Sequence, residues 1–117
     1  MEKPTSPAAD TLGLDGMESN PPCDGKFVVI VGSAVTPGRY ADDVSRLLST
    51  APGSHYLETA RSCPVFADRT TGGALIYAVY LGPYATLDQA CAARARTVRG
   101  AVVQQLTAQP TTRRPTC

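Results

Sequence analysis

Few side chains in this 117-residue chain could do acid–base or nucleophilic chemistry, and their spacing is unfavourable. Cys63 follows the only histidine, His55, by eight residues, and such a thiol–imidazole pair along one predicted strand is a weak signal for covalent catalysis. Asp42 and Asp43 are adjacent on a predicted helix, so their carboxylates point in different directions and suit a helix N-terminal turn better than a shared acid–base site. We therefore expect no enzymatic activity and no cofactor.

The four cysteines favour disulfide bonds over metal binding. None belongs to a C-x-x-C pair, and one histidine cannot complete a zinc site of ordinary spacing. An even number of cysteines in a small domain suggests two disulfides and hence an oxidising compartment, whereas four unrelated thiols in a cytosolic protein are the alternative. The cysteines are Cys23, Cys63, Cys91 and Cys117.

The charge is divided unevenly along the chain. Residues 1–25 carry five acidic residues and one lysine, a net charge of −4, whereas residues 26–117 carry ten basic and five acidic residues, a net charge of +5. A basic domain can favour polyanions, although an ordinary solvated surface is the plainer interpretation. The basic residues Arg94, Arg96 and Arg99 are not interleaved with aromatic residues, so we expect no nucleic-acid partner.

The sequence contains no membrane-spanning stretch, since no segment approaches the ~20 apolar residues that a bilayer requires. Its N-terminus also lacks the apolar segment of a signal peptide. The chain is therefore expected to be cytosolic or a piece of a longer anchored or exported protein.

Hydrophobic periodicity and turn residues predict one small folded domain over residues 25–108. The flanks are expected to be a disordered, acidic, proline-rich leader over 1–24 and a flexible Thr/Pro/Arg tail over 109–117. Thr36-Pro37 is expected to begin the first helix, and the sequence from Thr86 to Gln89 forms a capping box for the second. The predicted strands are 26–33, 54–62, 75–81 and 101–107, and the predicted helices are 37–51 and 86–99.

The order β-α-β-β-α-β predicts an α+β fold, a ferredoxin-like plait. With right-handed crossovers, its four antiparallel strands take the order 4-1-3-2, and both helices lie on one face of the sheet. The two most apolar strands, 26–33 and 75–81, then occupy the centre, as their composition requires.

The helix-free face of this sheet is expected to carry an exposed apolar strip. Because side chains alternate along a strand, Val28 and Ile30 on the first strand and Ala78 and Tyr80 on the third share that face if their neighbours face the helices. An exposed apolar patch usually has a partner. A sugar polymer stacked on Tyr80, a protein or second copy of the chain, or the leader folded back could cover it.

Two motifs carry a resemblance to a known family. The residues VIVGS at 29–33 and YAVYLGPY at 77–84 resemble the V-Q-V-G-S and Y-x-V-x-x-G-P-[FY] strands of SPOR domains, which bind peptidoglycan. The resemblance covers about residues 26–107. It implies that the helix-free face binds glycan strands stripped of stem peptides, as at division septa. Ile30 then takes the place of a frequent glutamine, Ser33 that of a functional serine, and Tyr80 offers a stacking face.

The segments RSCPVF at 61–66, IYAVYLGPY at 76–84 and AC at 90–91 look like an actinobacterial variety of this module. That likeness implies an extracytoplasmic domain in the cell envelope, whose membrane anchor would precede Met1. For this placement we expect the pairs Cys63–Cys91 and Cys23–Cys117, although four cysteines allow three pairings and sequence cannot choose among them. The alternative function is a protein-interaction or sensor module that binds no glycan and whose apolar strip binds a partner or forms a homodimer.

Overall fold

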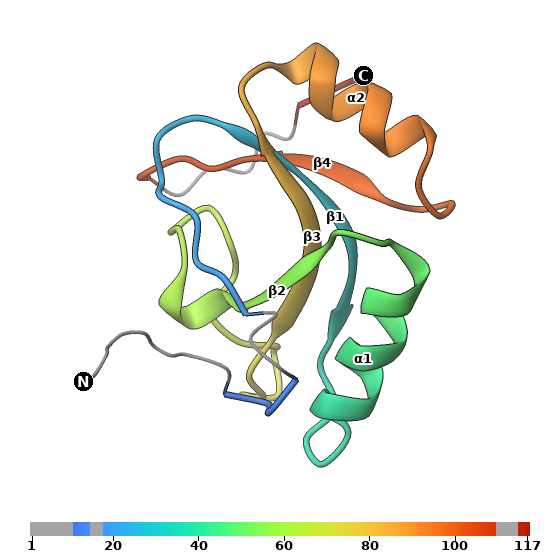
Figure 1. Ribbon diagram of the computed structural model, residues 1–117. Helices are drawn as coiled ribbons and strands as arrows, with labels where there is room; N and C mark the ends of the chain where they lie inside the picture. Colours follow the sequence, from blue (N-terminus) through green and yellow to red (C-terminus); the bar gives the residue numbers. More distant parts are fainter. Residues whose placement is uncertain (1–10, 15–17, 110–114) are drawn as a thin grey trace, which may run out of the picture.

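The computed structural model describes residues 11–14, 18–109 and 115–117, and it confirms the α+β plait (Figure 1). One antiparallel sheet has the strand order β2-β3-β1-β4. Two helices and one short 3-10 helix, η2, connect the strands. The elements are β1 (Phe27–Ala34), α1 (Tyr40–Thr50), β2 (His55–Glu58), η2 (Thr59–Arg61), β3 (Tyr77–Tyr84), α2 (Leu87–Ala95) and β4 (Val102–Gln105).

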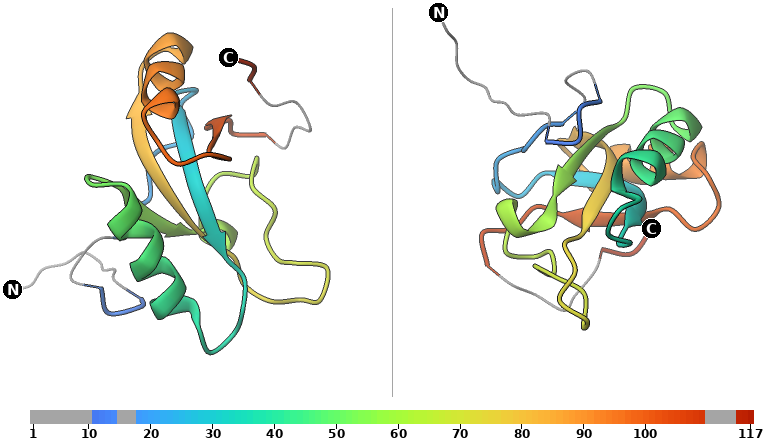
Figure 2. Two further views of the ribbon diagram at one scale, coloured as in Figure 1. Left: turned by 90° about the vertical axis from the view of Figure 1, so that its right-hand side faces the viewer. Right: turned by 90° about the horizontal axis from the view of Figure 1, so that it is seen from below.

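Both helices pack on the same face of the sheet, and the loop between η2 and β3 lies on the other (Figure 2). Beneath α2, Val29 packs with Ala90 and Ala93. Val44 of α1 packs with a second group of buried side chains from the sheet. This helix-side core contains Val29, Val31, Val44, Tyr56, Tyr77, Val79, Ala90, Ala93 and Val103. The predicted alternation of β1 and β3 is therefore confirmed.

The element boundaries differ from the predictions where turns intervene. Helix α1 begins at Tyr40, because Thr36 to Arg39 forms a turn closed by the Arg39 amide on the Thr36 carbonyl at 3.0 Å. Helix α2 has the predicted capping box: the Gln89 amide donates to Thr86 Oγ1 at 3.2 Å, and the Gln89 side chain accepts from the Thr86 amide. The expected strand over 54–62 ends at Glu58, where η2 begins.

A β-bulge in β1 changes the side-chain pattern at the end of the strand. Ile30 pairs with Tyr80, but Gly32 pairs with Val79, so β1 carries one extra residue between these pairs. Both Val31 and Gly32 consequently face α1, where a Cβ on Gly32 would lie 2.8 Å from a Leu47 methyl carbon. Ser33 pairs with Ala78 and lies on the helix-free face, which strict alternation from Ile30 would not allow.

The disulfides join Cys23 to Cys63 and Cys91 to Cys117, so the expected pairing is wrong. The sheet explains the correction. Cys63 is buried on the helix-free face, whereas Cys91 on α2 packs against the helix-side core, and the sheet separates them. The two bridges lie on different faces: Cys23 is bonded to Cys63 in the loop after η2, and Cys117, at the C-terminus, is bonded to Cys91 on α2 (Figure 1). Two disulfides indicate an oxidising environment for the folded chain.

Part of the expected leader belongs to the fold. Residues 18–24 contact the sheet and carry one of the bridged cysteines, contrary to the prediction of disorder through residue 24. Leu12 and Leu14 pack against the helix-side core. The leader predictions for 1–10 and 15–17 and the tail prediction for 110–114 lie outside the described residues. No helix within the described ranges is long and apolar enough to cross a membrane.

Candidate functional site

The apolar strip that the sequence predicts on the helix-free face exists, but most of it is covered. Val28, Ala78 and Tyr80 expose only 0%, 2% and 1% of their surface, so these three are not an open ligand-binding platform. Their cover comes from the chain itself: the leader contributes Cys23, as one of the three alternatives expected, but the rest comes from the loop after η2 and from Leu106. The covering residues are Cys23, Cys63, Val65, Phe66 and Leu106.

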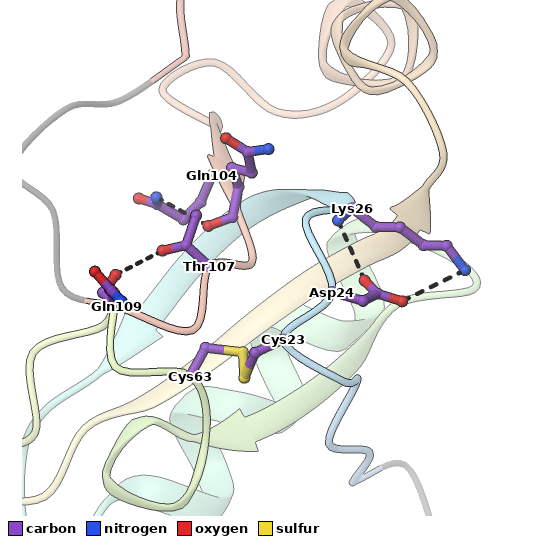
Figure 3. Close-up of a disulfide and its surroundings, with 8 residues drawn as sticks. Cys23, Asp24, Lys26, Cys63, Gln104, Thr107 and Gln109 are labelled. Carbon is purple, nitrogen blue, oxygen red and sulfur yellow. Dashed lines mark hydrogen bonds and ion pairs between the residues drawn. A yellow bond between two sulfur atoms is a disulfide. The ribbon is translucent and has the colours of Figure 1, made fainter.

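A strap formed by residues 18–25 crosses this face. It starts at the free edge of β2, where the Ser19 amide donates to the Tyr56 carbonyl at 2.9 Å, and ends where the Gly25 amide donates to the Leu106 carbonyl at 2.8 Å. In between, the Cys23–Cys63 disulfide ties the strap to the loop after η2 (Figure 3). The strap and this loop form a third layer over the sheet.

Tyr80 lies under the strap rather than at the surface. Its hydroxyl donates to the Ser19 carbonyl at 3.0 Å, and its ring lies 6.1 Å from that of His55. Burial raises the pKa of the Tyr80 hydroxyl above its ordinary value of 10.0. Tyr80 is therefore a structural residue in this protein.

The raised pKa of Tyr80 predicts a loss of stability at alkaline pH. Because the folded-state pKa lies above the unfolded value, the neutral phenol stabilises the fold fully below pH 10.0, and this contribution falls as pH rises through the folded-state pKa. Tyr77, whose pKa burial also raises, adds to the effect with the same sign. We expect the urea concentration at the midpoint of unfolding to decrease as the pH is raised above 10. In Tyr80→Phe we expect this decrease with pH to be less steep. Equal pH profiles for the two proteins would contradict this assignment.

One part of the helix-free face remains open, a groove that holds about 270 Å³. Its floor comes from three strands, and one wall comes from the loop between η2 and β3. We call it the sheet groove. It is lined by Ile30, Ser33, Thr59, Phe66, Ala67, Ile76, Ala78, Val102 and Gln104.

The sheet groove combines an apolar floor with two polar side chains. Ile30 and Val102 are cross-strand partners and are apolar. The Gln104 side chain is 8% exposed, and its Nε2 makes one long hydrogen bond, 3.4 Å, to the Gln105 carbonyl. Ser33 is exposed. A nearly buried amide beside an apolar floor suits a neutral ligand that has both apolar and amide or hydroxyl groups.

The structure also settles which polar residues of the edge strands face the groove. Gln104 faces it, whereas the Gln105 side chain donates to the Gly25 carbonyl at 3.0 Å. Tyr56 packs in the helix-side core, and Glu58 is ion-paired with Arg61 at 3.5 Å. Sequence patterns do not give these orientations, because the orientation of each edge strand depends on its register with the central strands.

Sequence reasoning missed the wall of the sheet groove. The loop is closed by the Thr59 amide, which donates to the Ile76 carbonyl at 2.9 Å, while the Thr59 hydroxyl lies 3.4 Å from the Asp68 carbonyl. These bonds place Phe66 over the sheet. The available signal was Phe66 itself, the one aromatic residue in this loop.

Two of the residues considered first for catalysis, Cys63 and Asp43, are committed to other interactions. Cys63 is in a disulfide, so it provides no thiol to pair with His55. Asp43 forms ion pairs with Arg39 and Arg46, at 3.7 and 3.4 Å. Within the described part of the chain, no three His, Cys, Asp or Glu residues gather into a group that could hold a metal ion.

Comparisons with known proteins add no assignment, since the chain matches no protein-family model, no curated protein and no solved structure. The interpretation therefore depends on the geometry of the sheet groove and on the two strand motifs. That geometry can hold a ligand between an apolar floor, an aromatic wall and one amide.

Proposed function

We propose that this domain is a noncatalytic, extracytoplasmic binding module that holds peptidoglycan glycan strands in the sheet groove. One observation supports this most: the bulge in β1 brings Ser33 onto the same face as Ile30, in the groove that Gln104 also lines. These are the two positions of the VIVGS motif that the SPOR resemblance marks for ligand contact. The two disulfides fit an oxidising site of action outside the cytoplasm.

The chemistry of an amino-sugar polymer suits this groove. Each N-acetyl group has a methyl that can lie on Ile30 and Val102, and an amide that can exchange hydrogen bonds with Gln104. Phe66 offers an apolar wall for the face of a sugar ring. Ile30 itself cannot make a hydrogen bond, so the proposal assigns the amide contact to Gln104 on the neighbouring strand.

The test is retention on purified, amidase-treated sacculi. We expect Gln104→Leu to lower retention about tenfold, since a lost hydrogen bond to a ligand amide that remains desolvated costs about 1–2 kcal/mol. Ser33→Ala is expected to lower it about threefold to fivefold on the same grounds. Ser45→Ala is the matched control, because Ser45 is exposed on α1, on the other side of the sheet.

A wild-type domain that is not retained would overturn the proposal, as would groove variants that are retained as well as the Ser45→Ala control. Thermal unfolding of each variant separates a lost contact from a lost fold. Gln104→Leu keeps a similar side-chain volume at this buried position, so its stability is expected to change by less than about 1.5 kcal/mol.

The apolar lining of the sheet groove favours a second candidate, a protein-interaction or sensor module. Ile30, Phe66, Ile76 and Val102 would suit a nonpolar side chain of a partner or of a second copy of this chain. Sedimentation separates the two candidates. A domain that dimerises through the groove loses the dimer in Val102→Lys, whereas a glycan-binding domain sediments as a monomer and is retained on sacculi.

A further inference from the structure

We propose that the strap is a displaceable cover, and that reduction of the Cys23–Cys63 disulfide extends the binding face from the sheet groove across Tyr80. This inference rests on the proposed function for its ligand. The covered and open parts are one surface: Ile30 in the groove is the cross-strand partner of Tyr80 under the strap, and Gln104 is the partner of Val28. The strap thus lies on the direct continuation of the groove.

The noncovalent contacts of the strap are few. Four hydrogen bonds between described residues hold it to the sheet and the end of β4: Ser19 to Tyr56, Tyr80 to Ser19, Gly25 to Leu106, and Gln105 to Gly25. All four use a strap backbone group, so the hydroxyl of a ligand could replace Ser19 as the partner of Tyr80. Among residues 18–25, only Pro21 is buried. The disulfide is therefore the strongest link between the strap and the face.

The surface beneath the strap is apolar and requires a cover. Leu57, Val28 and Tyr80 are each no more than 1% exposed, and each contributes to one cluster with the disulfide. Cys23 of the strap covers this surface together with Leu106 and with Cys63, Val65 and Phe66 of the loop after η2. Once the strap is released, a ligand with an apolar face can bury this apolar surface again in place of the strap.

Reduction requires a dithiol reductant, and the two sulfur atoms differ in accessibility. Cys23 is half-buried and Cys63 is fully buried, so a thiolate of the reductant attacks Sγ of Cys23. A mixed disulfide forms on Cys23, the Cys23–Cys63 bond breaks, and Cys63 leaves as a thiolate that takes up a proton. The second thiol of the reductant then displaces Cys23. The domain gains two electrons and two protons, and the reductant becomes a disulfide.

The test compares two double variants, each lacking one bridge. Cys23→Ser with Cys63→Ala frees the strap without burying a hydroxyl at position 63, and Cys91→Ser with Cys117→Ser is the control, since its bridge lies on the helix side. Hydrogen exchange is followed at the amides of Ser19 and Gly25. We expect both amides to exchange on the order of 10- to 100-fold faster in the first variant only, while the β1 and β3 amides stay protected.

Two further readouts examine the uncovered face. An apolar fluorescent dye is expected to bind the first variant and not the control, and retention on amidase-treated sacculi is expected to rise several-fold. Unchanged exchange at Ser19 and Gly25 would overturn the proposal. So would an open strap with unchanged retention, provided that the wild-type domain is retained. If sacculi retain no form of the domain, the proposed function fails. Amide exchange and dye binding still test whether the strap is a displaceable cover.

A second variant tests whether the disulfide holds the strap closed without the edge hydrogen bond, and protected β1 and β3 amides after reduction separate an open strap from an unfolded domain. Ser19→Pro removes the amide that donates to Tyr56 and leaves both disulfides in place. We expect this variant to bind the dye only after dithiothreitol is added. Dye binding before reduction would show that the disulfide does not hold the strap closed, and would overturn the proposal.

Discussion

Replacing Tyr80 by alanine is expected to lower the free energy of unfolding by about 3–5 kcal/mol, the usual cost of removing a large buried aromatic side chain. Tyr80 is 1% exposed, and its hydroxyl holds the Ser19 carbonyl at 3.0 Å. The substitution removes this hydrogen bond and leaves a cavity between the sheet and the strap. Such a loss is a large fraction of the stability of a small domain, so urea denaturation measures it directly.

Tyr80→Phe is the control for the Tyr80→Ala experiment. It keeps the ring and loses only the hydrogen bond to Ser19, so we expect a loss of about 1 kcal/mol. Its retention on sacculi is expected to equal that of the wild type, since the ring does not line the sheet groove. If Tyr80→Ala instead kept full stability and lost retention, Tyr80 would be a surface ligand contact, as the sequence alone suggested.

The sequence allowed the fold to be predicted because its strongest signals are local. Alternation in the two central strands placed Val29 and Val79 towards the helices and Val28 and Tyr80 on the opposite face, and the structure has this arrangement. The capping box at Thr86 was also readable, since both of its hydrogen bonds join residues three positions apart. Signals of this kind need no knowledge of distant parts of the chain.

The candidate site was less predictable because it depends on contacts between distant residues. Alternation cannot anticipate the bulge near Gly32 that moves Ser33 onto the helix-free face. The covering of Tyr80 depends on Cys23 meeting Cys63, 40 residues away in sequence. A leader rich in proline and polar residues has no apolar pattern that would show it to be docked. The predicted strip was therefore correct in its residues and wrong in its exposure.

Gly82→Ala is expected to lower the free energy of unfolding by about 2–4 kcal/mol, which in a domain of this size corresponds to a fall in Tm of roughly 10–20 °C. Gly82 lies in β3 with φ at +107°, a conformation that residues with a Cβ rarely adopt. An added Cβ would also lie 3.0 Å from the Phe27 carbonyl oxygen and 3.0 Å from the Tyr84 ring. The backbone at Phe27 cannot move without disturbing the pairing of β1 with β3 and β4.

Gly38→Ala separates the two causes of the Gly82→Ala effect. Gly38 also has a positive φ, +85°, but an added Cβ there would meet no atom within 4 Å. We therefore expect Gly38→Ala to cost only the conformational part, about 1 kcal/mol. Thermal unfolding of the two variants in the same buffer gives the comparison. Equal losses would mean that the contact with Phe27 contributes nothing, and that β1 and β3 tolerate a wider separation than their register indicates.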